Sequence, residues 1–185
     1  MILLVNGPNL NLLGEREPEI YGHTTLHEIE KLVRDACAGW NVEVRTFQSN
    51  HEGALIDFLQ EHRREAQGVI VNPGALAHSS YALHDCLQAM PCAVIVVSLE
   101  PPAAAPRPEV VAPPSAGRIA GLGPLGYYLA ALWHCQQLQL ATPVEGGATE
   151  TVAVPEGAPN LAQDLDPESL SEDIPVSGEP GEYEG

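Results

Sequence analysis

The chain of 185 residues is long enough for one domain with a substantial core, and it carries a formal net charge of −17. All eight Lys and Arg residues precede residue 142, whereas eleven of the 25 acidic residues follow Ala141. This balance argues against nucleic acid as a partner, because phosphate binding needs clustered Lys and Arg. The longest apolar runs are far shorter than a bilayer span, so we expect no membrane segment either.

The four cysteines, Cys37, Cys86, Cys92 and Cys135, show no CxxC spacing. We expect reduced, buried thiols in a cytoplasmic protein. The seven His residues show no metal-ligand spacing, and no Gly-rich phosphate loop follows an expected strand. We therefore expect neither a metal nor a nucleotide cofactor.

Strand-like and helix-like segments alternate over the first 98 residues. Strands are expected at 2–6, 42–47, 68–72 and 92–98, and helices at 25–39, 51–66 and 79–90. The turns between them are short and contain Gly, Asn or Pro. This alternation predicts an α/β protein with a parallel sheet covered by helices on both faces.

The pattern changes after residue 100. The stretch 101–117 contains six prolines, which excludes a helix interior and predicts an irregular loop. A short strand and turn at 118–123 and a closing amphipathic helix at 124–141 follow. Residues 142–185 are rich in Pro, Gly, Ser and acid and poor in large apolar side chains. We therefore expect one domain at 1–141 and a disordered acidic tail at 142–185.

Polar side chains follow the first expected strand in a long loop, NGPNLNLLGEREPEIYG. Arg16 and Tyr21 stand five residues apart in it. A tyrosine, with an ordinary pKa of about 10, becomes a base near neutrality only where a cation stabilises the phenolate. Arginine suits this role because it keeps its own proton. A long turn without chemistry would explain the Asn, Gly and Pro residues equally well.

A second polar segment, NPGALAHSSYALHD, follows the third expected strand. Asn72 ends the strand, His78 stands in the turn, and Asp85 lies in the middle of the next helix. Taken alone, His78 would suit a structural role as well as a functional one, and Asp85 would suit a solvated surface. The carboxyl ends of parallel strands meet at one edge of the sheet, where such sheets bind ligands.

Four blocks of this sequence resemble the signature blocks of the type II 3-dehydroquinate dehydratases. They are NGPNLNLLGEREPEIYG, QSNHEGALIDFLQ, VIVNPGALAHSSYALHD and GLGPLGYYLAAL. The resemblance implies a flavodoxin-like three-layer fold whose five-stranded parallel sheet has the order 2-1-3-4-5. It also implies trimers that pair into a dodecamer. The implied activity is a lyase step of the shikimate pathway, which leads to aromatic amino acids: anti elimination of water from 3-dehydroquinate to 3-dehydroshikimate through an enolate.

The resemblance implies roles residue by residue. Tyr21 corresponds to the family's base, and Arg16 to the residue that lowers the tyrosine pKa. Asn9 corresponds to the asparagine that holds a water against the enolate oxygen. Asn72 and His78 correspond to contacts with substrate hydroxyls.

The fourth strand end, VIVVSLEPP, departs from the family pattern Glu-Val-His-Ile-Ser-Asn. Ungapped alignment places Val96 at the Glu, Ser98 at the His and Glu100 at the Ser. The family's His is the general acid that protonates the departing hydroxyl, and serine cannot replace it directly. The turn at Ser98, Leu99 and Glu100 corresponds to the family's site for the substrate carboxylate, toward which Glu100 would bring a like charge.

Three functions remain open at this point. The first is dehydration of 3-dehydroquinate, with reduced activity. The second is a non-catalytic dehydroquinase paralogue that binds a small polyhydroxy acid or partners a true dehydroquinase. The third is another lyase or isomerase that uses Tyr21 and Arg16 on a different 2-keto or cyclohexanone acid.

The resemblance also predicts an assembly. Asp85 corresponds to an acid that reaches a neighbouring subunit's site, which predicts a trimer or a multiple of it.

Overall fold

A computed structural model describes residues 1–15, 23–99, 109–111 and 116–141. The chain divides into two units, Met1–Pro143 and Val144–Gly185, and all of these residues belong to the first. The expected tail at 142–185 lies outside the described residues, as do Arg16, Tyr21 and Glu100.

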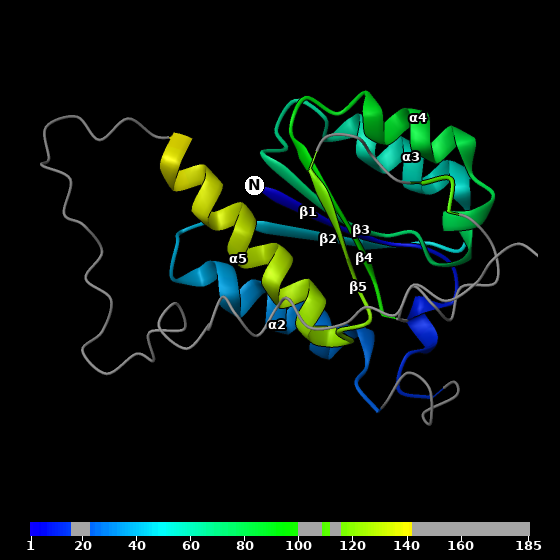
Figure 1. Ribbon diagram of the computed structural model, residues 1–185, viewed down its shortest axis with the longest axis horizontal. Coiled ribbons are helices and arrows are strands. Elements are labelled where there is room, and N and C mark those ends of the chain that lie inside the picture. The colour runs from blue at the N-terminus through cyan, green and yellow to red at the C-terminus, as the bar shows by residue number, and fades with distance from the viewer. Residues whose placement is uncertain (16–22, 100–108, 112–115, 142–185) are drawn as a thin grey trace, which may run out of the picture. The chain divides into compact units, whose positions relative to one another are not determined.

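Within the described residues, five parallel strands form one sheet with the order β2-β1-β3-β4-β5 (Figure 1). The strands are β1 (Ile2–Asn6), β2 (Val44–Gln48), β3 (Gly68–Asn72), β4 (Ala93–Ser98) and β5 (Gly117–Ala120). Central strands of a parallel sheet are buried on both faces, which explains the continuous apolar runs of β1, β3 and β4. The α/β class and the strand order expected from the resemblance are both confirmed.

Helices cover both faces of the sheet (Figure 1). Helices α2 (Leu26–Ala38) and α5 (Pro124–Ala141) pack together on one face, and α3 (Glu52–Glu61) and α4 (Tyr81–Gln88) pack together on the other. Two short 3₁₀ helices, η1 (Leu10–Leu12) and η2 (Gly74–His78), follow β1 and β3. None of the helices in the described part of the chain is both long enough and apolar enough to cross a bilayer.

The core consists of two apolar layers, one on each face of the sheet, because successive strand side chains point to opposite faces. The layer beneath α2 and α5 includes Ile2, Leu4, Ile70, Ile95 and Val97. The layer beneath α3 and α4 includes Leu3, Val5, Val69, Val71 and Val96. Both faces of the sheet are therefore covered, and open parallel sheets of this kind bind ligands beyond the carboxyl ends of their strands.

Several element boundaries differ from those expected. The strand expected at 42–47 begins only at Val44, because the Val42 amide donates to the Cys37 carbonyl and closes the end of α2. The helix expected at 51–66 ends at Glu61, because the following residues form tight turns, among them Glu65 N–H to His62 O at 3.1 Å. The helix expected at 79–90 begins at Tyr81, because Ser80 caps it by accepting from the Leu83 amide at 2.9 Å.

The cysteines are all free, as expected. Cys37, Cys86 and Cys135 are buried, but Cys92, just before β4, is only partly buried, which corrects the expectation for that residue. Burial raises the pKa of the Cys37 thiol to about 12. Since the thiolate is the reactive form, this cysteine is unreactive at neutral pH.

Candidate active site

A cavity of about 270 Å³ lies at the carboxyl edge of the sheet. Residues from the segments 8–13, 72–78 and 96–99, at the ends of β1, β3 and β4, form most of its wall, and Glu109 and Arg118 complete it. The position agrees with the general rule that open parallel sheets bind ligands beyond the carboxyl ends of their strands.

Five residues expected at the site line this cavity: Asn9, Asn72, His78, Ser98 and Leu99. Asp85 does not. It lies on the exposed side of α4, away from the cavity of its own chain. The described part of the chain contains no group of three or more His, Cys, Asp and Glu side chains placed to hold a metal ion.

The loops after β1 and β3 lie in direct backbone contact. The Gly7 amide donates to the Asn72 carbonyl at 2.8 Å, and a Cβ added at Gly7 would stand 2.3 Å from the Pro73 oxygen. Gly74, with φ of +56°, has the Pro8 oxygen 3.0 Å from the position of such a Cβ. Glycine is needed at both positions because any side chain would separate the two walls of the cavity.

Asn9 is held by its backbone at the rim of the cavity. Its φ of 66° is left-handed, a conformation that asparagine tolerates better than most residues. Its amide donates to Oδ1 of Asn50 at 2.9 Å, and Nε2 of Gln48 donates to the same oxygen at 3.2 Å. The QSN segment after β2 thus holds the Asn9 backbone, while the exposed Asn9 side chain stays available for a ligand.

A buried hydrogen-bond relay fixes the side chain of Asn72. Its Nδ2 donates to the Tyr127 hydroxyl at 2.8 Å, and that hydroxyl donates to Oδ1 of Asn6 at 2.9 Å. Oδ1 of Asn72 accepts from the Gly74 amide at 3.0 Å. Burial raises the pKa of Tyr127 above its ordinary value, so this tyrosine stays protonated and acts as a structural donor. Neither Tyr127 nor Asn6 was expected here, although both lie in the blocks that carry the resemblance.

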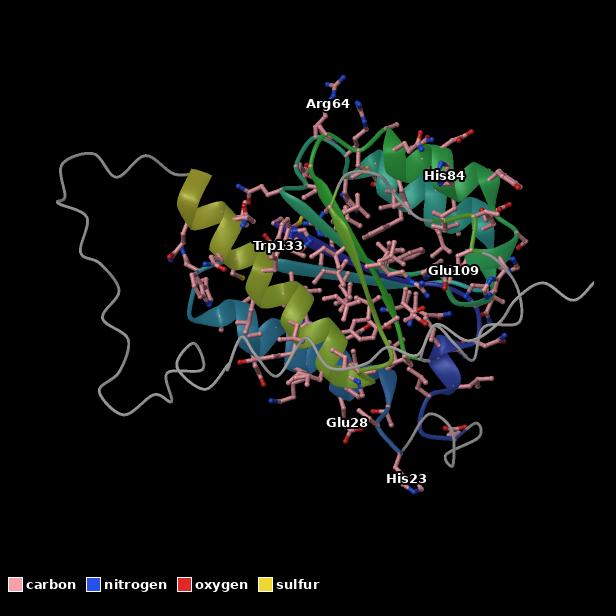
Figure 2. The ribbon with its side chains drawn as sticks, in the orientation of Figure 1. His23, Glu28, Arg64, His84, Glu109 and Trp133 are labelled. Atoms are coloured by element: carbon pink, nitrogen blue, oxygen red, sulfur yellow. The ribbon has the colours of Figure 1, made fainter. Side chains whose placement is uncertain are left out.

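The cavity wall near His78 is anchored to the segment 109–111. The Ala77 carbonyl accepts from the Val110 amide at 2.7 Å and from the Val111 amide at 3.1 Å. Val111 is fully buried in the layer beneath α3 and α4. These contacts hold the neighbouring Glu109 at the carboxyl edge of the sheet (Figure 2).

Comparison with known proteins decides the family. The family model described as "Dehydroquinase class II" matches residues 1–135. A 3-dehydroquinate dehydratase of Roseiflexus castenholzii is 49% identical over 138 residues, which are 71% of this chain and 86% of that protein. One from Thermus thermophilus is 44% identical over 148 residues, covering 76% of this chain and 97% of that protein. The chain belongs to the class II dehydroquinase family.

Solved structures agree with this assignment. The type II dehydroquinase of Butyrivibrio crossotus matches with a TM-score of 0.69 at 38% identity, covering 72% of this chain and 95% of that one. The type II dehydroquinase of Propionibacterium acnes matches with the same TM-score at 33% identity, covering 73% and 95%. The matched region therefore covers nearly the whole length of each of these two solved structures.

The β4 side of this dehydroquinase cavity has no ionisable side chain at the two positions where the resemblance places the family's Glu and His. Val96 is buried and apolar, and the side chain of Ser98 carries only a hydroxyl. The charged groups come instead from Glu109 and from Arg118 of β5, which form an ion pair. Sequence reasoning missed both residues. The available signal was the alternation along β5, whose Arg118 pairs in register with Val96 and so shares its face.

Proposed function

We propose that this chain catalyses the dehydration of 3-dehydroquinate to 3-dehydroshikimate, a lyase reaction of the shikimate pathway. The observation that carries the proposal is membership of the class II dehydroquinase family, with relatives named 3-dehydroquinate dehydratase at 44–49% identity. The cavity at the carboxyl edge of the sheet supports it, because five residues with expected roles converge there.

The proton-abstraction half of the reaction is assigned by position. Tyr21 takes the proton beside the ketone, and Arg16 favours its phenolate form. Asn9 holds the water that stabilises the enolate oxygen, and its backbone anchoring at the cavity rim suits that role. Asn72 and His78 contact substrate hydroxyls, and the relay through Tyr127 pre-orients the Asn72 amide for this purpose.

The second half of the reaction, the departure of hydroxide, lacks the family's general acid. A serine at position 98 does not supply a proton near neutral pH, and loss of general acid catalysis costs roughly 10²- to 10⁴-fold in rate. We therefore propose a dehydratase of reduced activity. Because Val96 and Ser98 replace ionisable residues, a binding-only paralogue is the second candidate function.

The deciding experiment follows the ultraviolet absorbance of the conjugated product when the purified chain meets 3-dehydroquinate. We expect enzyme-dependent turnover that falls short of the kcat of about 1 per second at the lower end of ordinary enzymes. No turnover, combined with calorimetric binding of the unreactive reduced analogue quinate, would establish the paralogue instead. Turnover at or above that rate would remove the case for a weakened site.

The strand end can be tested separately by restoring the family residues. Ser98→His supplies a group that titrates near neutrality, and Glu100→Ser removes a charge that repels the substrate carboxylate. We expect the double variant to raise kcat/KM by more than the product of the two single effects, because neighbouring groups couple. Adding Tyr21→Phe should abolish the gain. A double variant no faster than the parent would refute this alignment of the strand end.

We further propose a trimer, and by extension the dodecamer of the family, as the working assembly. Asp85 and Tyr81 lie four residues apart on α4 and therefore share one helix face, and the Tyr81 side chain is 69% exposed. Leu122, Leu125 and Leu129 form a second exposed apolar set beside β5 and α5. Exposed apolar groups of this kind fit contacts between copies. Light scattering that gives a monomer at working concentration would contradict the proposal and leave Asp85 a surface acid.

The domain and its location complete the proposal. We propose that residues 1–141 form the catalytic domain, that 142–185 form a solvated tail, and that the protein acts in the cytoplasm. The four free cysteines support a reducing compartment. Truncation after Ala141 should leave assembly and turnover unchanged, because the tail has few large apolar side chains to bury.

A further inference from the structure

The cavity contains a charged pair that none of the assigned roles uses. Nη2 of Arg118 donates to Oε1 of Glu109, and both residues line the cavity. Among the described lining residues, Arg118 is the only Lys or Arg, and His78 is the only other side chain able to carry positive charge.

The strand register explains why this ion pair lies beside β4, where Ser98 stands in place of the family's general acid. In β5, Arg118 pairs with Val96 of β4, so both side chains point to the same face of the sheet. Ser98, two residues after Val96, points to that face as well. A cation that β4 does not provide is therefore provided by the neighbouring strand.

The guanidinium has donors left for a ligand. Arginine carries five N–H donors in a planar fork, and the hydrogen bond to Glu109 uses one of them. The Arg118 side chain is 34% exposed and lines the cavity, so its remaining donors are open to a ligand there. This fork matches the geometry of a carboxylate.

Glu109 forms an ion pair with Arg118 and is itself only slightly exposed. Its side chain is 13% exposed, and Oε2 has no hydrogen-bond partner among the described residues. The bonds from Val110 and Val111 to the Ala77 carbonyl hold its backbone in place. A buried carboxylate needs a compensating cation, so Glu109 restricts Arg118 to this position.

We infer that Arg118 is the cationic anchor for the substrate's carboxylate in this chain, with Glu109 as its positioning residue. The inference rests on the proposed function for the identity of the substrate, but not for the presence of the anion site. In 3-dehydroquinate the carboxylate and the departing hydroxyl are attached to the same ring carbon, so binding of the carboxylate by Arg118 holds the substrate next to the bond that breaks. Arg118 thereby supplies, from β5, a positive charge at the cavity, where the described residues of β4 supply none.

The test measures binding of quinate and of its methyl ester by calorimetry, because the two ligands differ in charge at the carboxyl group alone. We expect the wild-type chain to bind the acid about tenfold to a hundredfold more tightly than the ester, the range for a hydrogen bond to a charged group. Arg118→Gln combined with Glu109→Gln removes both charges without leaving either buried and unpaired. This double variant should bind acid and ester about equally, and Arg118→Lys should give an intermediate ratio.

Two comparisons separate binding from folding. Arg45→Gln, at the opposite end of the sheet, should leave the acid-to-ester ratio unchanged. Glu109→Ala should lower the ratio, whereas Glu109→Gln should largely keep it, because the amide oxygen still accepts from Arg118. A merely structural Glu109 would change the melting temperature without changing the ratio.

Each outcome has a definite meaning. A double variant that keeps the wild-type ratio, or a wild-type chain that binds neither ligand, overturns the inference. A wild-type chain that shows the Arg118-dependent ratio but does not convert 3-dehydroquinate keeps the anchor and rejects the dehydratase. Turnover with a ratio independent of Arg118 keeps the dehydratase and rejects the anchor. Where turnover is present, the double variant should raise KM at least about tenfold with a smaller change in kcat.

Discussion

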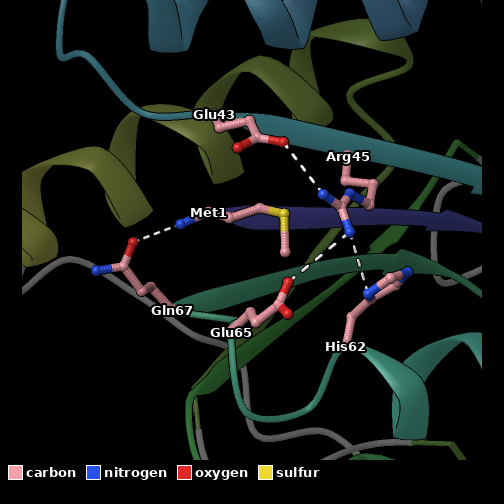
Figure 3. A network of polar contacts seen from close by, with 6 residues as sticks. All are labelled: Met1, Glu43, Arg45, His62, Glu65 and Gln67. Atoms are coloured by element: carbon pink, nitrogen blue, oxygen red, sulfur yellow. Dashed lines mark hydrogen bonds and ion pairs between the residues drawn. The ribbon is translucent and has the colours of Figure 1, made fainter.

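The two ends of the sheet each contain an arginine among carboxylates, and they differ in what surrounds it. At the amino end, Arg45 lies 3.5 Å from Glu43 and 3.8 Å from Glu65, and its Nη1 stands 3.1 Å from Nδ1 of His62 (Figure 3). Both carboxylates are about two-thirds exposed. At the carboxyl end, Arg118 pairs with one carboxylate among the described residues, Glu109, whose side chain is only 13% exposed, and the cavity lies beside it.

The difference indicates which arginine can serve a ligand. Donors that are shared among several exposed partners contribute little to stability, since solvent screens such pairs. A donor beside a cavity and a buried counter-charge is both less screened and accessible to an anion. The ion pairs of Arg45 therefore contribute little to stability, whereas Arg118 is available to bind an anion. This difference leads to four predictions.

The largest effect is expected for the proposed catalytic base. Tyr21→Phe should lower kcat by roughly 10²- to 10⁴-fold, because no base would remain to take the substrate proton. The melting temperature should hardly change. Tyr128→Phe, a half-buried tyrosine of α5 outside the cavity lining, is the matched control and should keep normal turnover. Equal losses in both variants would show that the tyrosine effect is not specific to the site.

The next largest effect is a pH dependence of stability that originates at His134, which packs against the start of β3. Burial lowers the pKa of His134 to about 4, and its Nε2 lies 3.1 Å from the Val69 carbonyl. The unfolded chain takes up this proton below about pH 6.5, whereas the folded chain does so only near pH 4. The free energy of unfolding should therefore fall by up to about 3 kcal/mol as the pH drops through this window.

Urea denaturation at several pH values measures this change. His134→Gln should remove that part of the pH dependence, since glutamine does not titrate. His27→Gln, an exposed position on α2, should retain it. A slope that persists without His134 would assign the proton uptake to another group.

A smaller effect is expected at Gly68, the first residue of β3, with Gly53 of α3 as its control. A Cβ at Gly68 would stand 2.5 Å from Nδ1 of His134, whereas a Cβ at Gly53 meets nothing within 4 Å. Gly68→Ala should therefore lower the free energy of unfolding by about 1–3 kcal/mol through overpacking. Gly53→Ala, within α3, should raise it by up to about 1 kcal/mol. Denaturant midpoints measure both, and equal shifts would contradict the packing argument.

The smallest effect is expected at Arg45. Arg45→Gln should change stability by at most about 1 kcal/mol, because its ion pairs are exposed. Turnover and the acid-to-ester binding ratio should not change. A loss of binding in this variant would remove the distinction between the two ends of the sheet.

Much of the fold could be predicted because it depends on local patterns. The expected strands at 2–6 and 68–72 and the helix at 124–141 coincide with β1, β3 and α5. Boundaries were less accurate where a single hydrogen bond decides them, as at Val42 and Ser80. Periodicity reports which face is buried, but it does not report which side chain caps a helix.

The residues of the candidate site also differ in how well the sequence predicted them. Asn9, Asn72 and His78 were predictable because each stands in a characteristic block directly after a strand, and parallel topology brings strand ends together. Asp85 was expected to reach a neighbouring subunit's site; it lies on the exposed side of α4, and its use by a second chain stays a prediction. Tyr127 was missed because its role depends on Asn6 and Asn72, which are distant from it in the sequence.

The amino-acid sequence by itself determined the α/β class, the family resemblance and the absence of an ionisable residue at Val96 and Ser98, because these are properties of local pattern and residue identity. Only the tertiary structure decided that Glu109 and Arg118 meet in the cavity. That meeting requires β5 to pair in register with β4 and the Ala77 carbonyl to hold the segment at 109–111. Contacts between segments with no shared pattern become visible only when the sheet brings them to one edge.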